Sequence, residues 1–247
     1  MKLTPGKIAA MLAGAGSAAA AIWVYRDYQK WLALGPGGLP YNFGGWISTT
    51  RMRLRAIDPL DTGRFQTVMD DWDEALLEEL PSRQGQRPSI GVHPVPHRQL
   101  DQLPGENMKR EIVSVFDAAV ARSPEFIEYQ LSHFEKRHPA ITLRRGAARH
   151  AHAIASRGEV AHVHPSDGSM HMIFSSRDAA FVIERGWGES HPLAGVMLDL
   201  PETYLLIYPP RDPEELAVTE RLLEAAIAHM ARLPQRETVL RQKEAAE

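Results

Sequence analysis

Two short runs of alternating polar and apolar residues flank the tetrapeptide Pro165-Ser-Asp-Gly168, and they constrain the fold more than any other feature of the sequence. The first run is Glu159–His164 and the second is Ser169–Phe174. Alternation has the period of a β-strand, and Asp-Gly supplies the positive φ that a tight turn requires. The pattern therefore predicts a β-hairpin, and with it an antiparallel sheet.

Helix and strand patterns are interleaved along the rest of the chain, without the regular alternation of a parallel βαβ sheet. Further helices are predicted at 61–80, 108–122, 176–185 and 212–233, with an edge strand at 87–96 and a buried strand at 203–208. The residues expected to face inward on the first two helices are Phe65, Val68, Met69, Trp72, Leu76, Leu77, Leu80, Ile112, Val113, Phe116 and Val120. We expect an α+β domain in which helices pack on a largely antiparallel sheet.

The N-terminal segment Ile8–Tyr25 contains no charged residue, and its length is at the short end of what spans a bilayer, roughly 17–25 residues. Thr4-Pro5 supplies a helix start. The aromatic residues Trp23, Tyr25, Tyr28 and Trp31 are placed as an interfacial belt. We therefore predict one uncleaved N-terminal transmembrane helix. Because much of the segment is Ala, Gly and Ser, a signal peptide and a buried or surface helix remain alternatives.

The sequence Gly35-Pro-Gly-Gly38 breaks this helix and starts a linker. The predicted divisions are a membrane anchor at 1–34, a linker at 35–60, a catalytic domain at 61–235 and a frayed tail at 236–247. Arginines at 51, 53 and 55 favour a cytosolic main domain, whereas Lys2 and Lys7 favour the opposite orientation. The predicted location is the endoplasmic reticulum membrane, with the domain in the cytosol.

Composition excludes several classes of function. The net charge is -3, so no basic surface points to a nucleic-acid partner. The chain has no cysteine, which excludes disulfides, thiolate metal sites and cysteine nucleophiles. Dinucleotide-binding, phosphate-loop, zinc-helix and serine-hydrolase signatures are also absent. Redox chemistry would therefore use electrons of the substrate itself or a histidine-bound metal.

Three histidines of the predicted hairpin form the sharpest candidate site. Alternation places His162 and His164 on one face, and His171 on the returning strand can face the same way. Neutral imidazoles bind Zn, Fe, Cu and Ni, and they also transfer protons near neutral pH. A polar face turned to solvent is the alternative. The remaining paired histidines, His93 with His97 and His150 with His152, are expected in loops.

A second candidate site is the Gly-rich segment Gly186–Pro192, which includes Trp187 and His191. Trp187 is placed to stack on a flat ligand, or else to cover the core behind a helix end. Arg211 follows the last predicted strand. It is placed to hold an anionic oxygen, or else to lie beside the acidic start of the next helix.

Several of these segments resemble fungal luciferases. They are Arg26-Asp-Tyr-Gln-Lys-Trp-Leu32, Arg87-Pro-Ser-Ile90, Glu159-Val-Ala-His-Val-His164, Gly186-Trp-Gly-Glu-Ser-His-Pro-Leu-Ala-Gly195 and Tyr208-Pro-Pro-Arg211. The resemblance runs from the predicted anchor almost to the end of the last helix and is weak between about 98 and 157. The decapeptide that begins at Gly186 is its most specific part.

The resemblance implies an oxygenase of 3-hydroxyhispidin, a hydroxylated styryl-pyrone. Molecular oxygen adds, carbon dioxide leaves and an excited caffeylpyruvate-type product emits green light, with oxygen as co-substrate and no cofactor. One histidine would deprotonate the enol of the pyrone, Arg211 would hold the developing anion, and Trp187 would pack on the ring. The implied catalytic residues are His162, His164, His171, His191 and Arg211, and the implied substrate-binding residues are Glu159, Trp187 and Tyr208.

Two other functions remain open. One is a non-luminous homologue that binds or oxidises another phenolic or pyrone metabolite, with or without a metal at His162, His164 and His171. The other is a membrane-anchored interaction module, in which the loop Gly186–Gly195 has only a structural role.

Overall fold

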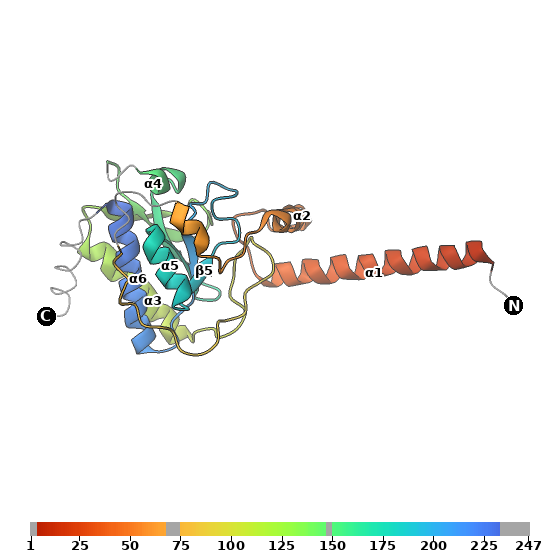
Figure 1. Ribbon diagram of the computed structural model, residues 1–247, viewed down its shortest axis with the longest axis horizontal. Helices are drawn as coiled ribbons and strands as arrows, with labels where there is room; N and C mark the ends of the chain where they lie inside the picture. Colours follow the sequence, from red (N-terminus) through yellow and green to blue (C-terminus); the bar gives the residue numbers. More distant parts are fainter. Residues whose placement is uncertain (1–3, 68–74, 147–149, 233–247) are drawn as a thin grey trace.

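Six strands form one antiparallel sheet in the order β1-β2-β3-β4-β6-β5. The computed structural model describes residues 4–67, 75–146 and 150–232 (Figure 1). The strands are β1 Ile127–Leu131, β2 Pro139–Leu143, β3 Glu159–Val163, β4 Met170–Ile173, β5 Gly188–Ser190 and β6 Tyr204–Ile207. This sheet and its packed helices confirm the predicted α+β class.

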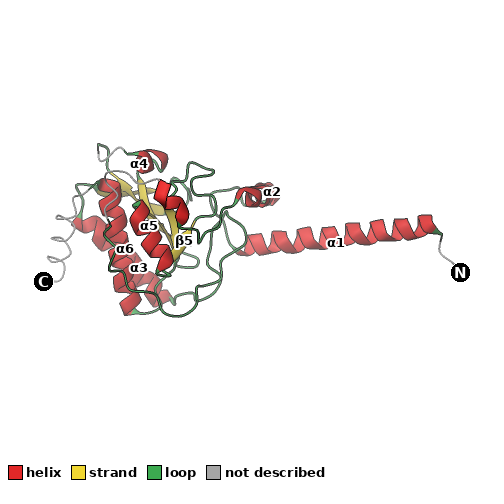
Figure 2. Cartoon of the chain, viewed as in Figure 1, coloured by secondary structure: helices red, strands yellow, loops and turns green. Residues whose placement is uncertain are grey.

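Some of the helices form a layer that covers one face of the sheet (Figure 2). The α-helices of the described residues are α1 Pro5–Ala33, α2 Phe43–Met52, α3 Glu106–Arg122, α4 Ala151–Ala155, α5 Ser176–Glu184 and α6 Pro213–Ala231, and 3₁₀ helices lie at Arg53–Arg55 and Gly63–Thr67. As predicted, α6 begins at an Asp cap: Asp212 Oδ1 accepts a hydrogen bond of 2.8 Å from the Glu215 N–H. Helix α6 packs on α3, β3 and β4, and Leu222 and Leu223 on it are fully buried.

The hairpin β3-β4 forms where the alternation predicts it, and Gly168 in its turn has a φ of 74°. Its register places His162 directly opposite His171, and Leu206 of β6 lies opposite His171 in turn. Residues opposite one another across a sheet share a face. The histidines therefore lie on one face, and Met170 and Met172 point to the other.

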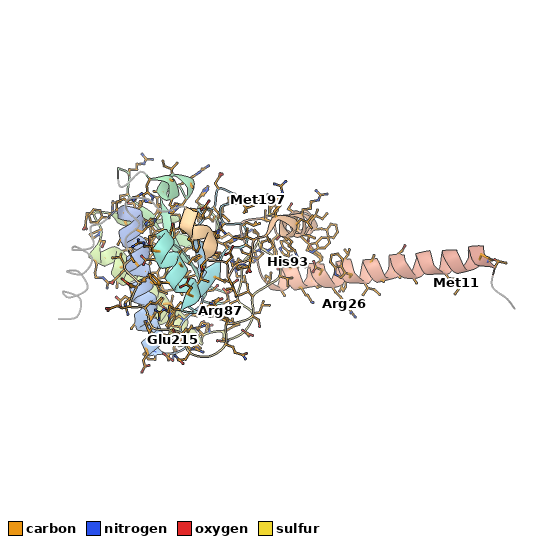
Figure 3. The ribbon with its side chains drawn as sticks, in the orientation of Figure 1. Met11, Arg26, Arg87, His93, Met197 and Glu215 are labelled. Atoms are coloured by element: carbon orange, nitrogen blue, oxygen red, sulfur yellow. The ribbon has the colours of Figure 1, made fainter. Side chains whose placement is uncertain are left out.

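Helix α1 extends away from the rest of the molecule, with Met11 far from the sheet (Figure 3). It starts at Pro5 as predicted, and Gly35, with a φ of 78°, follows its end. Within the described residues, no helix is long and apolar enough to cross a membrane, so the structure does not support the predicted transmembrane helix. The Ala, Gly and Ser residues of the segment lower its hydropathy below that of a span. The predicted cellular location and domain divisions stay predictions.

The aromatic residues at the end of α1 attach the helix to the domain. Trp31 is buried, and its Nε1 donates a hydrogen bond of 2.9 Å to the carbonyl oxygen of Val95. Tyr28 packs edge-on against Trp46 of α2. Trp23, in contrast, is 54% exposed. Half of the predicted interfacial belt is thus part of a small core of the protein.

The predicted helix at 61–80 differs from the structure. Only the 3₁₀ helix Gly63–Thr67 forms at its start, and Val68, Met69 and Trp72 lie outside the described residues. Residues 75–80 are not helical, because the N–H of Leu77 donates instead to Asp178 Oδ1 at 2.8 Å. The predicted edge strand at 87–96 is irregular and pairs through an isolated bridge between Ile90 and Gln99.

Helix α3 confirms the second predicted helix, with Ile112 and Phe116 buried. Val113 is 47% exposed, so its predicted inward position is wrong. It lines a surface groove of about 530 Å³ between α3 and the edge of the sheet.

Candidate active site

Five buried histidines gather on the face of the sheet opposite α6. The strands supply His162 and His171, and the segments that follow β3 and β5 supply His164 and His191. His97 comes from the loop before α3. The ring centroid of His171 lies 5.0 Å from that of His164, 5.3 Å from His162, 5.5 Å from His191 and 5.6 Å from His97. We call these five residues the histidine cluster.

Glu159 orients the ring of His162 from the start of the same strand. Its Oε1 lies 2.6 Å from Nδ1 of His162. The carboxylate also accepts hydrogen bonds from the Ser132 hydroxyl at 3.0 Å and the His133 N–H at 2.6 Å. Glu159 is 2% exposed and does not line the cavity of about 270 Å³ that opens onto the cluster. Glu159 therefore lies outside the cavity and fixes the orientation of the His162 imidazole.

His164 is fixed at both ring nitrogens. Nη1 of Arg98 lies 2.9 Å from its Nε2, and a guanidinium can only donate, so this nitrogen accepts. The proton is therefore on Nδ1, which donates to the Ser169 hydroxyl at 2.8 Å. Ser169 donates in turn to Asp167 Oδ2 at 2.7 Å. Burial, and then the charge of Arg98, holds the pKa of His164 well below its ordinary value.

Arg98 and Glu135 form a buried ion pair at the edge of the cluster. Two guanidinium nitrogens reach the carboxylate, at 3.2 and 2.8 Å, and the residues are 3% and 6% exposed. Burial raises the pKa of Glu135, but the charge and hydrogen bonds of Arg98 outweigh it, and the pKa is lowered overall. A positive charge therefore lies beside the cluster and is balanced locally.

His97 is oriented by a carboxylate on β5. Nε2 of His97 lies 3.1 Å from Oε1 of Glu189, and the other carboxylate oxygen accepts a hydrogen bond of 2.8 Å from the Tyr208 hydroxyl. Nδ1 of His97 is buried and has no hydrogen-bond partner among the described residues. This arrangement leaves one nitrogen of His97 open to a ligand.

His171 is held by backbone and by stacking. Its Nδ1 lies 3.0 Å from the carbonyl oxygen of Leu205, which only accepts, so Nδ1 carries the proton and Nε2 the lone pair. The ring stacks on Tyr204. Burial, and then the neighbouring His162 and His191, holds the pKa of His171 well below its ordinary value. His171 is therefore neutral at neutral pH and can accept a proton.

His191 is more constrained. Its Nδ1 accepts a hydrogen bond of 3.1 Å from the N–H of Leu193. Burial, and then the neighbouring His97 and Arg98, holds its pKa well below the ordinary value. A neutral ring that accepts at Nδ1 carries its proton on Nε2. His191 can therefore donate a hydrogen bond but is a poor base.

A cavity of about 270 Å³ opens onto this cluster. Its polar lining includes His97, Glu135, His171, His191 and Tyr204, and its apolar lining includes Leu39, Val95, Pro96, Phe134, Leu198 and Leu200. The volume is close to the lower end of small-molecule pockets, about 300–1,000 Å³. The larger groove beside α3 touches the cluster at His164, whereas this cavity is lined by His97, His171 and His191. It is the better candidate for chemistry.

Three residues at the opening of the cavity have left-handed backbone conformations. Lys136, Leu198 and Asp199 have φ values of 59°, 64° and 55°, and all three are exposed. A side chain other than Gly, Asn or Asp is uncommon in this region. Such conformations concentrate at binding sites, where the surrounding structure imposes them.

Two of the predicted site residues lie away from this cavity. Trp187 is buried in the core, and its Nε1 donates to the carbonyl oxygen of Pro81 at 2.6 Å. Arg211 pairs with Glu215 at the start of α6 and also donates to the carbonyl oxygen of Gln84 at 2.7 Å. Trp187 thus covers the core, and Arg211 lies beside the acidic start of the next helix, as the alternative predictions for these two residues stated. Arg98 is the guanidinium that lies against the histidines.

Tyr208 and Glu159 do not line the cavity. Glu159 orients His162, and Tyr208 orients Glu189, the carboxylate that contacts His97. The residues that sequence patterns missed are His97, Arg98, Glu135, Glu189 and Tyr204. His97 was expected in a loop, and it is in one. A buried loop histidine beside a buried arginine leaves no periodic signal in the sequence.

Two overlapping sets of three histidines have the spacing of metal ligands. They are His97, His171 and His191, and His162, His164 and His171; within each set the ligand atoms lie within 4.8 Å of one another. In the second set, Nε2 of His164 already accepts from Arg98, whose charge opposes a bound cation. In the first set, Nδ1 of His191 is engaged by Leu193. A metal would therefore displace existing hydrogen bonds at either place.

Comparisons of the sequence with protein families and with known proteins all point to the same family. A family profile described as "Luciferase domain" matches residues 157–226. A luciferase of Armillaria ostoyae is 31% identical over 230 residues, which cover 88% of this chain and 85% of the relative. Luciferases of Armillaria mellea and Neonothopanus nambi are each 30% identical, over 88% and 85% of this chain and 85% and 82% of their own lengths. No solved structure matches the chain significantly.

Proposed function

Because this chain belongs to the fungal luciferase family, we propose that it is an oxygenase that acts on a hydroxylated pyrone of the 3-hydroxyhispidin type. The observation that carries the proposal is the cavity at the histidine cluster. It is lined by His171, a neutral histidine whose Nε2 carries the lone pair, and it is large enough for one flat molecule. Its apolar walls suit an aromatic substrate and molecular oxygen.

The proposed reaction needs no external reductant. The enol oxygen loses its proton, and the electron-rich enolate transfers electrons to oxygen as a carbon–oxygen bond forms. The peroxide then breaks its oxygen–oxygen bond, and one ring carbon leaves as carbon dioxide. The product is a caffeylpyruvate-type acid that is formed in an excited state and emits light. Substrate plus O₂ equals product plus CO₂, so atoms and electrons balance.

We assign the proton transfer to His171. Its Nε2 carries the lone pair, its ring lines the cavity, and its pKa is held low while the cavity has no anion. An enolate next to the imidazolium would raise that pKa, because an opposite charge favours the charged form. His97 is the second candidate base, since its Nδ1 is open and Glu189 orients its ring.

Arg98 does not line the cavity, so it would stabilise the charge that develops on oxygen from behind the histidines that do. Arg98 is buried, and its positive charge lies against His164 and Glu135. In a site that excludes water, such preorganised charges stabilise a transition state strongly. The bonds from Glu159 and Ser169 hold His162 and His164 in place, so that the cluster does not reorganise during the reaction.

The test is light emission from purified protein mixed with 3-hydroxyhispidin, in air and in an oxygen-free control. Oxygen uptake and pyrone loss are followed in parallel. Oxygen-dependent green light with equal uptake of oxygen and loss of pyrone supports the whole proposal. Consumption without light supports a non-luminous oxygenase. A folded protein that neither binds nor consumes the pyrone contradicts the proposal.

A second candidate is a metal-dependent oxygenase of another phenolic or pyrone metabolite, and the spacing of the histidine ligand atoms favours it. Three neutral imidazoles suit divalent iron, copper and zinc. Metal analysis of protein as purified, together with activity after chelation, separates the two candidates. Activity that a chelator abolishes and one metal restores favours the second.

A further inference from the structure

A second group of histidines lies outside the active site, where α4 meets the last turn of α6 (Figure 1). It consists of His150, His152 and His229, and one nitrogen from each ring lies within 4.8 Å of the others. His229 is 8% exposed, whereas His150 is half-buried and His152 similarly so. The group is therefore anchored in the protein and accessible from solvent.

The spacing of the rings is close to that of a metal site. Nδ1 of His152 lies 2.9 Å from Nε2 of His229. Two imidazole nitrogens on a tetrahedral ion, each about 2.0–2.1 Å from the metal, would lie about 3.3 Å apart. A small outward movement of one ring would admit the ion. The hydroxyl of Thr203, 3.4 Å from Nδ1 of His152, adds an oxygen atom at the same place.

The surroundings of the group favour a cation. Nε2 of His150 lies 3.2 Å from the carbonyl oxygen of Met230, and the ring must donate there because a carbonyl only accepts. Histidines that bind metals commonly donate their other nitrogen to a carbonyl in this way. His229 lies in the last turn of α6, at the negative end of the helix dipole.

We propose that His150, His152 and His229 bind one divalent transition-metal ion of the zinc class, with solvent completing the coordination. The ion joins α4, which precedes β3, to the end of α6, which is 77 positions further along the chain. Its role is structural, and the site does not depend on the proposed oxygenase reaction. It differs from the active-site cluster, where Arg98 lies against the histidines.

The test measures zinc bound by the 247-residue chain after removal and reloading of metal. Compared are the wild type, His150→Ala, His152→Ala and, as a control for the internal cluster, His171→Ala. We expect the wild type and His171→Ala to bind about one equivalent at this site, and the dissociation constant to rise about tenfold or more in the other two variants. Zinc should also raise the melting temperature of the wild type but not of His152→Ala.

Cobalt provides an independent readout, because four-coordinate Co²⁺ absorbs strongly in the visible range and the band should be lost in His152→Ala. His150→Ala changes a half-buried cap residue of α4, so it serves as the test if His152→Ala fails to fold. Zinc binding that both variants retain in full, or folded wild type that binds no zinc, overturns the proposal. Zinc that only His171→Ala loses places the metal in the active-site cluster and also overturns it.

Discussion

The rings of His171 and Tyr204 stack almost parallel, with centroids 4.4 Å apart and planes 12° apart. His171 is on β4 and Tyr204 is on β6, and the neighbouring backbone carbonyl of Leu205 accepts the Nδ1 proton of the histidine. The stack and the hydrogen bond together fix the tautomer and the plane of the ring. Tyr204 therefore acts on the proposed base by positioning it.

Tyr204→Phe should keep the ring stack and nearly full activity, whereas Tyr204→Leu should lose the stack and part of the activity. An aromatic pair contributes about 0.5–1.5 kcal/mol, which corresponds to a fall of up to about tenfold in kcat. Oxygen uptake with 3-hydroxyhispidin measures both variants. An equal loss in the two variants would contradict the positioning role and would indicate that the hydroxyl matters instead.

His171→Gln should lower kcat by about 10²–10⁴-fold, because it removes the proposed base while keeping a polar side chain in the cavity. The matched control is His93→Gln. His93 is also a buried histidine, but it lies beside Asp27 near the end of α1, away from the cavity. Its variant should keep kcat. A similar loss in both variants would mean that the effect comes from the fold, and circular dichroism checks this directly.

Glu189→Gln and Tyr208→Phe should each lower activity without removing a cavity nitrogen. Glu189 lies between His97 and the Tyr208 hydroxyl, so both changes weaken the orientation of His97. If His97 assists the reaction, we expect a fall in kcat of about tenfold with KM nearly unchanged. A fall in Glu189→Gln with none in Tyr208→Phe would indicate a direct role for the carboxylate.

The hairpin and part of the site could be predicted from the sequence, because both depend on local patterns. Alternation places His162 and His164 together, and the Asp167-Gly168 turn sets the register that brings His171 opposite His162. His191 follows the Gly-rich segment after α5. These residues lie in the 157–226 range that the family profile also covers.

The rest of the site depends on contacts between distant segments. Arg98 and His164 are 66 positions apart, and Arg98 and Glu135 are 37 apart. Neither Arg98 nor Glu135 belongs to a strand or helix with a readable period. Arg211 is the opposite case: its partner Glu215 is only one helical turn away, and this local pairing is the alternative that the sequence indicated.

Arg98→Ala should destabilise the fold by about 3–5 kcal/mol, because it leaves the carboxylate of Glu135 buried without its partner. Replacing both residues by Met and Leu should cost much less, since no buried charge is left unpaired. Urea denaturation of Arg98→Met, Glu135→Leu and the double variant that combines them gives the coupling energy. A double variant that is as unstable as the sum of the singles would argue against a coupled pair.

The pH dependence of stability follows from the neutral histidines. His164, His171 and His191 have pKa values well below the ordinary value of 6.5 in the folded protein. In the unfolded chain they return to that value, so below pH 6.5 the unfolded state binds more protons. The free energy of unfolding should therefore be constant above about pH 7.5 and fall on acidification, by up to about 1.4 kcal/mol per pH unit for each histidine. The lowered pKa of Glu135 acts separately, and its contribution is lost only in the range below its ordinary value of 4.5.

Urea denaturation between about pH 5.5 and 8 measures this slope in the wild type and in His171→Gln. The variant lacks one of the three depressed imidazoles, so its stability should fall less steeply, by about one proton. His93→Gln is a weaker control, because the pKa of His93 is lowered mainly by burial but partly restored by Asp27. Stability that rises on acidification from pH 7 would contradict neutral histidines in the folded site. An unchanged slope in His171→Gln would mean that His171 has the same pKa in the folded and unfolded states, which would contradict the lowered pKa of His171.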